Sequence, residues 1–373
     1  MKIRYLYLDD EAEATTEAIV AMLGRQRDDL EVIYQYPKLF SEQASEIMTG
    51  GFDGLLLDLR LDQVAHAGGQ KADYGAFALA QEIRARATDG RLLDIPIILC
   101  STEEKIKKSF KHDDTSHDLF DIFVLKDTIS DRIEEFTCKM VSLSTGYRNL
   151  SAGITSRKSL HEIFGVEKEF FDALDPRIWS SFVDEFHDYP PHEIARFIIR
   201  ELFERSGPLI NEATLAARLG VDPSCSPGWN NIIHDLQHAE FNGPFKEGWR
   251  RWWSKKVEYW WEKLDGCPGR LKSLSARKRV EFLKIRISDE LVPFTPIEDG
   301  YSESFWTICI ATNWPLDPLD GLLAAGPDPK PWQDKKYLSI KAALERIGFT
   351  NGIKVHPIER DRLASIKASS KEK

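Results

Sequence analysis

The chain of 373 residues has few cysteines and no long apolar run. Its five cysteines are odd in number and scattered, and no two have the C-x-x-C spacing of a zinc or redox site. We therefore expect a reduced protein without structural zinc. No apolar run approaches the roughly 18 to 20 residues of a membrane helix. Acidic residues interrupt the N-terminus where the apolar part of a signal peptide would lie. The sequence thus predicts a cytoplasmic protein without membrane contact.

Motifs of common catalytic sites are also missing from the later part of the chain. Beyond residue 164 there is no nucleotide-binding glycine loop, no H-E-x-x-H and no G-x-S-x-G. His234 and His238 have a helical i, i+4 spacing, but no glutamate stands beside His234 as in zinc proteases, and His187 and His192 add no motif. No metal site is expected among these histidines, and no separate catalytic domain is evident.

Charge is distributed unevenly along the chain. Residues 1–140 contain 17 Lys+Arg and 27 Asp+Glu, which sum to −10, so the remaining residues contain 33 of each and sum to zero. A neutral second part gives no global electrostatic case for nucleic-acid binding. The length fits two domains. We predict a first domain at 1–145, a mostly helical (α+β) domain at 165–363 and a disordered tail at 364–373. The segment at 146–164, rich in serine, glycine and basic residues, is expected to be a linker or a connecting helix.

The first domain alternates short apolar runs with helical patterns. The helical patterns fall at 11–24, 38–50, 74–87, 103–110 and 128–142. Five β/α repeats at this spacing predict an α/β fold, a doubly wound parallel sheet with helices on both faces.

Polar residues stand where the strand-like runs end, and they are Asp9 and Asp10, Asp58, Ser101, and Lys126. In an open parallel sheet the ligand crevice lies outside the carboxyl ends of the strands. Carboxylates beside a hydroxyl and an ammonium group are suited to holding Mg²⁺ and transferring a phosphoryl group. A single carboxylate at a strand end is usually solvated or caps a helix. Five suitable polar residues, each at the end of a strand, are not expected to arise together for those reasons.

With these five positions in this order, residues 1–145 resemble the receiver domain of two-component response regulators, which has a flavodoxin-like (βα)5 fold. The resemblance implies that Asp58 accepts a phosphoryl group from a histidine kinase or phosphotransfer protein. It also implies that Asp9, Asp10 and Asp58, with the backbone carbonyl of Arg60, hold Mg²⁺.

The same resemblance assigns the remaining site residues. Ser101 would report phosphorylation, Lys126 would pair with the phosphate, and Phe123 would be the aromatic switch. Such a receiver catalyses its own phosphorylation and dephosphorylation. Two features depart from the family pattern: Asp62 and Asp127 replace prolines, and the loop at 63–71 is several residues longer than usual. This loop is either a lid over the site or a tolerated surface insertion.

The second domain offers a helix-turn-helix hypothesis. Residues 194–203 have the pattern of an amphipathic helix, and helices are expected at 212–219 and 229–238. The second of these would expose Asn230, Asn231 and His234 for base contacts. However, the connection between them is about twice the usual 3 to 4 residues. A strand at 305–311 and a helix at 337–347 complete the predicted elements.

Tryptophans and basic residues gather at 246–286, where 13 Lys+Arg face 5 Asp+Glu. On a helix Trp249, Trp252, Trp253 and Trp260 would share one face. Such a stripe is typical of a core, although aromatics among basic residues can also stack nucleic-acid bases. The basic face is equally suited to docking the acidic first domain.

We therefore predict a response regulator whose phosphorylated receiver switches a C-terminal output domain. DNA and a protein remain alternative partners of that domain, a catalytic output stays open because no motif excludes it, and a homodimer is left open. The alternative function is a phosphorelay adapter or phosphate sink whose C-terminal domain binds protein.

Overall fold

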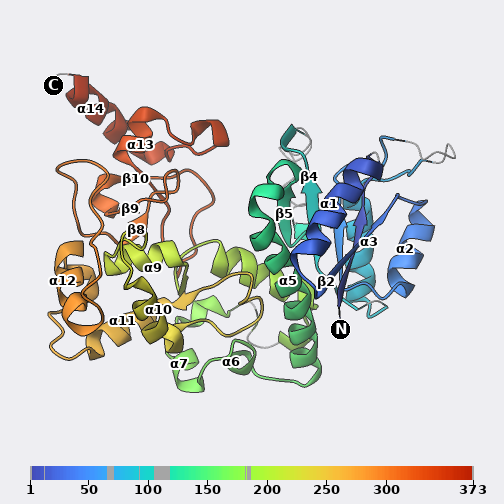
Figure 1. Cartoon of the computed structure of the whole chain (residues 1–373), viewed down its shortest axis with the longest axis horizontal. Coiled ribbons are helices and arrows are strands. Elements are labelled where there is room, and N and C mark those ends of the chain that lie inside the picture. Colours follow the sequence, from blue (N-terminus) through green and yellow to red (C-terminus); the bar gives the residue numbers. More distant parts are fainter. Residues whose placement is uncertain are drawn as a thin grey trace. The chain divides into compact units, whose positions relative to one another are not determined.

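The computed structural model describes residues 2–11, 13–64, 71–91, 93–104, 118–180, 182 and 186–371. The chain divides into two compact units, which are described separately (Figure 1). Unit 1 comprises Met1–Ala173, Trp179–Glu201 and Asn242–Trp249, and unit 2 comprises Leu174–Ile178, Leu202–Phe241 and Arg250–Lys373. No helix in the described part of the chain is both long and apolar enough to span a bilayer.

Unit 1 is built on a parallel sheet of five strands in the order β2-β1-β3-β4-β5. The strands are β1 (Ile3–Leu8), β2 (Leu30–Gln35), β3 (Gly54–Leu57), β4 (Ile97–Ser101) and β5 (Ile122–Leu125). Every residue of β3 and β4 is buried, as expected for inner strands covered on both faces. The order reverses between β1 and β3, so the predicted flavodoxin-like, doubly wound sheet is confirmed.

The described part of unit 1 also contains α-helices. They are α1 (Glu13–Gln26), α2 (Phe40–Thr49), α3 (Ala76–Thr88), α5 (Ile133–Thr155), α6 (Leu160–Ile163), α7 (Lys168–Asp172) and α8 (Pro191–Arg196). The pattern at 128–142 predicts only part of α5, which has 23 residues and continues into the predicted linker. Most of the helix expected at 103–110 lies outside the described residues.

Two glycines allow close packing around α5. A Cβ atom on Gly54 would lie 2.3 Å from the ring of Tyr5, whose hydroxyl donates to the carbonyl of Met140 at 2.7 Å. A Cβ atom on Gly146 would lie 2.2 Å from the ring of Phe245. Phe245 itself has a φ of +69°, a left-handed conformation that a bulky residue adopts only when its surroundings impose it. The segment Asn242–Trp249 is therefore held tightly against α5.

Unit 2 is mostly helical with short two-stranded antiparallel sheets. Its helices are α9 (Glu212–Leu219), α10 (Trp229–Asp235), α11 (Ser254–Lys263), α12 (Ala276–Arg286), α13 (Ile340–Glu345) and α14 (Arg360–Lys371). Its strands are β6 (Leu209–Ile210), β7 (Trp252–Trp253), β8 (Thr307–Ile308), β9 (Pro315–Leu316), β10 (Gly321–Leu323) and β11 (Tyr337–Ser339). A π-helix, Phe197–Phe203, follows α8 and crosses from unit 1 into unit 2.

Some predicted elements of the second part differ from the structure. Helix α9 has the predicted bounds, whereas the strand expected at 305–311 is reduced to β8. The helix expected at 337–347 starts only at Ile340, because Tyr337–Ser339 pairs with β10. Helix α14 continues to Lys371, through the segment predicted to be disordered, and its Leu363 and Ile366 pack against a core that includes Leu322.

The tryptophan stretch is core and is not a base-stacking surface. Trp252, Trp253 and Trp261 are fully buried, and Trp249 and Trp260 are 8% and 7% exposed. Their placement on one continuous helix is wrong, because Trp252–Trp253 forms strand β7 and the helix begins at Ser254. Strand pairing with Leu209–Ile210 explains this difference, since it holds the two tryptophans in extended backbone.

Candidate functional site

The carboxyl ends of four strands bring the predicted site residues together. Leu8 pairs with Leu57 in the sheet, so Asp9 and Asp58, the residues that follow them, are neighbours. Ser101 ends β4 and pairs with Leu125 of β5, which puts Lys126 beside them. Asp9, Asp10, Asp58 and Ser101 are 0 to 1% exposed. Four segments distant in sequence therefore meet in one buried polar cluster.

Lys126 is the cation of this cluster. Its Nζ atom lies 2.6 Å from Asp9, 3.0 Å from Asp58 and 3.3 Å from Glu11. Burial alone would lower the pKa of Lys126, but the carboxylates of Asp58 and Asp9 outweigh it and raise the pKa above its usual value. The side chain is 6% exposed, so the ammonium charge is directed into the cluster and not to solvent.

Asp9 is bonded at both carboxylate oxygens. Its Oδ2 atom accepts from the hydroxyl of Tyr7 at 2.5 Å and from Lys126, and its Oδ1 atom accepts from the backbone N–H of Glu11 at 3.0 Å. Burial raises the pKa of Asp9; Lys126 opposes this effect and the charge of Asp58 adds to it. The carboxylate is thus fixed in position and strongly influenced by its neighbours.

Asp10 has one bonded and one open oxygen. Its Oδ2 atom accepts from the backbone N–H groups of Gln63 and Val64, at 2.5 and 2.8 Å. The carbonyl of Val64 accepts in turn from the hydroxyl of Tyr36. The Oδ1 atom of Asp10 is buried and accepts no hydrogen bond from the described residues. The start of the long loop is therefore hydrogen-bonded to Asp10. Residues 65–70, which would decide between a lid and a surface insertion, lie outside the described residues.

The donor set fits a divalent cation. Asp9, Asp10 and Asp58 each offer an oxygen, and the three oxygens lie within 4.8 Å of one another. Hard carboxylate oxygens are the ligands that Mg²⁺ prefers, and a buried carboxylate oxygen without a partner is costly unless a cation or water binds it. The orphaned Asp10 Oδ1 therefore supports a metal at this point. Arg60 donates its backbone N–H to Asp58 at 3.0 Å, and its side chain pairs with Asp62.

The two predicted switch residues, Ser101 and Phe123, differ in their exposure to solvent. The hydroxyl of Ser101 is fully buried and has no hydrogen-bond partner among the described residues. Phe123 is 39% exposed on β5, and its ring centroid lies 5.9 Å from that of Phe120. Ser101 thus retains unused hydrogen-bonding capacity beside Asp58, while Phe123 is partly exposed to solvent.

Two members of the cluster were missed by the sequence analysis, namely Tyr7 and Glu11. Tyr7 lies two residues before Asp9, so both side chains leave the strand on the same face. A hydroxyl in a strand, two positions from a candidate ligand and on the same face, is a signal that the sequence does contain. Glu11 gives no such signal, because acidic residues at the start of a helix are common.

The solved structures described below are similar to the N-terminal portion of the chain. No family model matches the chain, and no curated protein matches it. Among solved structures, it is similar to NtrX from Brucella abortus at 18% identity over 41% of this chain, with a TM-score of 0.30. The chain spans only 29% of the length of that protein.

Two shorter solved structures are receiver domains themselves. One is a response regulator receiver domain (CheY-like) from Methylobacillus flagellatus, 17% identical, covering 34% of this chain and 87% of that one, with a TM-score of 0.24. The other is the receiver domain of NtrX from Brucella abortus, 16% identical, covering 35% and 98%, with a TM-score of 0.24. The N-terminal portion is thus similar to response regulator receiver domains, and the rest of the chain is not recognised.

Proposed function

We propose that unit 1 is a receiver that accepts a phosphoryl group on Asp58 in a Mg²⁺-dependent reaction, and that the chain acts as a two-component response regulator. The observation that carries this proposal is the cluster of three buried carboxylates with one ammonium group and an open oxygen on Asp10. A structural ion pair needs only one carboxylate per cation. This cluster has more carboxylates than cations, and the excess negative charge would repel an anionic phosphoryl donor unless a cation is bound.

The chain's own residues have distinct tasks in this reaction. A carboxylate oxygen of Asp58 attacks phosphorus, the bond from phosphorus to the histidine nitrogen of a kinase or phosphotransfer protein breaks, and an aspartyl-phosphate forms. Lys126, 3.0 Å from Asp58, stabilises the oxygens that gain negative charge. Asp9 holds Lys126 in place through its 2.6 Å contact.

Asp10 and Asp58, with Asp9 and the carbonyl of Arg60, would hold the metal. When bound, Mg²⁺ offsets the repulsion between the carboxylate and the anionic donor. The product adds roughly −1.5 to −2 charges and three strong acceptors. The buried hydroxyl of Ser101, which has no described partner, is the donor available to one of those acceptors.

Phosphorylation of the full chain with acetyl phosphate tests the proposal. We expect a mass increase of one phosphoryl group in the presence of Mg²⁺, located on Asp58 and released by base. Asp58→Asn should abolish it, whereas Asp62→Asn, at a partly exposed carboxylate paired with Arg60, should not. Labelling that persists in Asp58→Asn would refute the assignment of the acceptor.

A further inference from the structure

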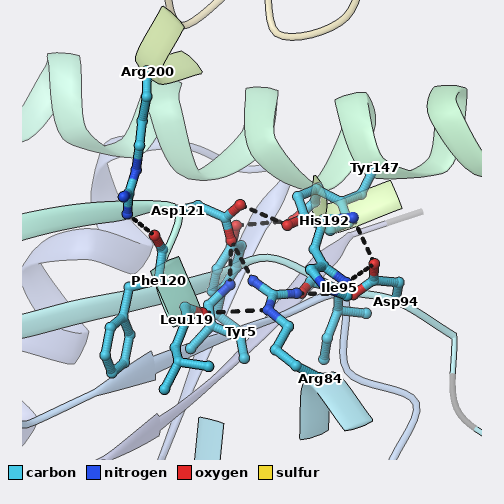
Figure 2. A network of polar contacts seen from close by, with 12 residues as sticks. Tyr5, Arg84, Asp94, Ile95, Leu119, Phe120, Asp121, Tyr147, His192 and Arg200 are labelled. Atoms are coloured by element: carbon cyan, nitrogen blue, oxygen red, sulfur yellow. Dashed lines mark hydrogen bonds and ion pairs between the residues drawn. The ribbon is translucent and has the colours of Figure 1, made fainter. Parts of the chain in front are cut away.

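A buried polar network lies at the opposite end of the same sheet, before the amino ends of β4 and β5 (Figure 2). Arg84 of α3 is at its centre and pairs with Asp94 at 2.8 Å and with Asp121 at 2.9 Å. These three side chains are 2 to 6% exposed. The hydroxyl of Tyr147, from α5, donates to the other oxygen of Asp121 at 2.5 Å. The network therefore joins α3 and α5 to both strands.

A segment from much later in the chain completes this network. The backbone N–H of His192, in α8, donates to Asp94 at 2.7 Å, and the ring Nδ1 atom lies 2.8 Å from the same oxygen (Figure 2). An ionised carboxylate only accepts hydrogen bonds, so Nδ1 carries the proton here. Burial alone would raise the pKa of Asp94, but Arg84 and His192 outweigh it and hold the pKa below its usual value.

A second contact holds the same segment to β5. Arg200 donates to the carboxylate of Asp118 at 2.8 Å and to the carbonyl of Phe120 at 2.9 Å. Arg196 lies 3.6 Å from the other oxygen of Asp118. Residues 191–201, called the coupling segment below, are thus fixed before β4 through His192 and before β5 through Arg200.

The coupling segment leads directly into unit 2. The boundary between the units falls between Glu201 and Leu202, inside the π-helix Phe197–Phe203. π-helical turns are rare and occur frequently at functional sites. The segment Asn242–Trp249 returns to unit 1, where the N–H of Gly248 donates to Ser142 of α5 at 2.9 Å. Two of the segments that adjoin unit 2 in the chain are therefore bound within unit 1.

Strands β4 and β5 connect the coupling segment with the candidate acceptor site. Ser101 and Lys126 lie at their carboxyl ends, and Asp94 and Asp121 lie just before their amino ends. β4 has five residues and is fully buried, so it transmits a displacement as a packed, rigid element. Movement of Ser101 or Lys126 towards a phosphoryl group would therefore reach the contacts of the coupling segment.

We infer that the coupling segment is the element through which the state of Asp58 reaches unit 2. While Asp58 is unmodified, the contacts of His192 and Arg200 hold the segment, as in this structure. Phosphorylation loosens them. This inference rests on the proposed function, because it states how the aspartyl-phosphate is read.

Hydrogen exchange of the full chain, followed by mass spectrometry, tests the inference. With acetyl phosphate and Mg²⁺, amide exchange at 191–201 should rise by at least about threefold in the natural sequence and stay unchanged in Asp58→Asn. His192→Ala should raise it without phosphate. His187→Ala is the matched control, because the ring Nε2 atom of that half-buried histidine lies 3.0 Å from the carbonyl of Lys158, which is outside the buried network. Arg200→Met, which removes the contact with Phe120, serves if His192→Ala fails to fold.

The same samples separate the two ideas. A phosphoryl mass increase on Asp58 with unchanged exchange at 191–201 would overturn the inference and leave the proposed function intact. Absence of any mass increase would refute the proposed function and, with it, the signal that the segment is inferred to carry. Equal exchange in His192→Ala and His187→Ala would show that the His192 contact does not hold the segment, which also overturns the inference.

Discussion

The two ends of the unit 1 sheet carry buried charged clusters of opposite character. At the carboxyl ends, three buried carboxylates lie in a cluster with one ammonium group, and Asp10 Oδ1 and the Ser101 hydroxyl lack described partners. At the amino ends, both oxygens of Asp94 and of Asp121 accept hydrogen bonds. Completed networks stabilise a fold, whereas incomplete ones are typical of ligand sites. The comparison therefore separates a candidate binding cluster, at the carboxyl ends, from a supporting cluster, at the amino ends.

The largest expected effect is on the supporting cluster. Arg84→Met would leave Asp94 and Asp121 buried without their guanidinium partner, and breaking a buried ion pair in this way costs about 3 to 5 kcal/mol. We expect a decrease of that size in the free energy of unfolding, measured with urea. Arg91→Met is the control, because Arg91 and Asp89 form an exposed pair whose loss should cost less than about 1 kcal/mol. Equal decreases would remove the distinction between the clusters.

The next largest effect is expected on the rate at which the cluster of Asp9, Asp10, Asp58 and Lys126 is phosphorylated. Lys126→Ala removes the charge beside Asp58, so labelling by acetyl phosphate should slow by about 100-fold, as on loss of one preorganised donor. Lys38→Ala, which breaks a more exposed pair with Glu46, should not change the rate. An unaltered rate in Lys126→Ala would contradict its role at the transferring group.

The smallest effect is a difference in pH dependence. The raised pKa of Asp9 means that its contribution to stability is present below its unfolded value of 3.8 and is lost as pH rises through the folded pKa. Without Mg²⁺ at pH 7, Asp9→Asn should therefore stabilise the protein, on the order of 1 kcal/mol. The gain should vanish as the pH falls to about 4.

Substitution of Asp94 by Asn should change the stability in the opposite direction. Its pKa is lowered, so its contribution is present above the unfolded value of 3.8 and is lost as pH falls through the folded pKa. Asp94→Asn should destabilise the protein at pH 7, and the difference should shrink in acid. Urea unfolding across pH measures both variants, and shifts of the same sign would contradict the contrast.

The binding cluster was predictable from sequence because its chemistry follows a local rule. Residues that follow strands of a parallel sheet meet at one edge, so Asp9, Asp58 and Lys126 could be placed from the ends of the strand-like apolar runs. The strands and most helix positions of unit 1 followed from apolar runs. Tyr7 was missed because the apolar pattern of its strand was read without considering its hydroxyl.

The supporting cluster could not be predicted in that way. Arg84, Asp121 and Tyr147 stand in helical or loop patterns without a recurring spacing, and His192 contacts Asp94 across 98 residues of sequence. Similarly, Trp252 and Trp253 fit a helical stripe, and only pairing with a distant strand places them in β7. Contacts between distant segments override local pattern at such positions.

Titration calorimetry of the full chain with Mg²⁺ tests the central claim most directly. We expect a single Mg²⁺ site. Binding should be lost in Asp10→Asn, because the Oδ1 atom of Asp10 accepts no hydrogen bond from the described residues, and it should be retained in Asp62→Asn. Absence of Mg²⁺ binding by the natural sequence, or undiminished binding by Asp10→Asn, would contradict the account.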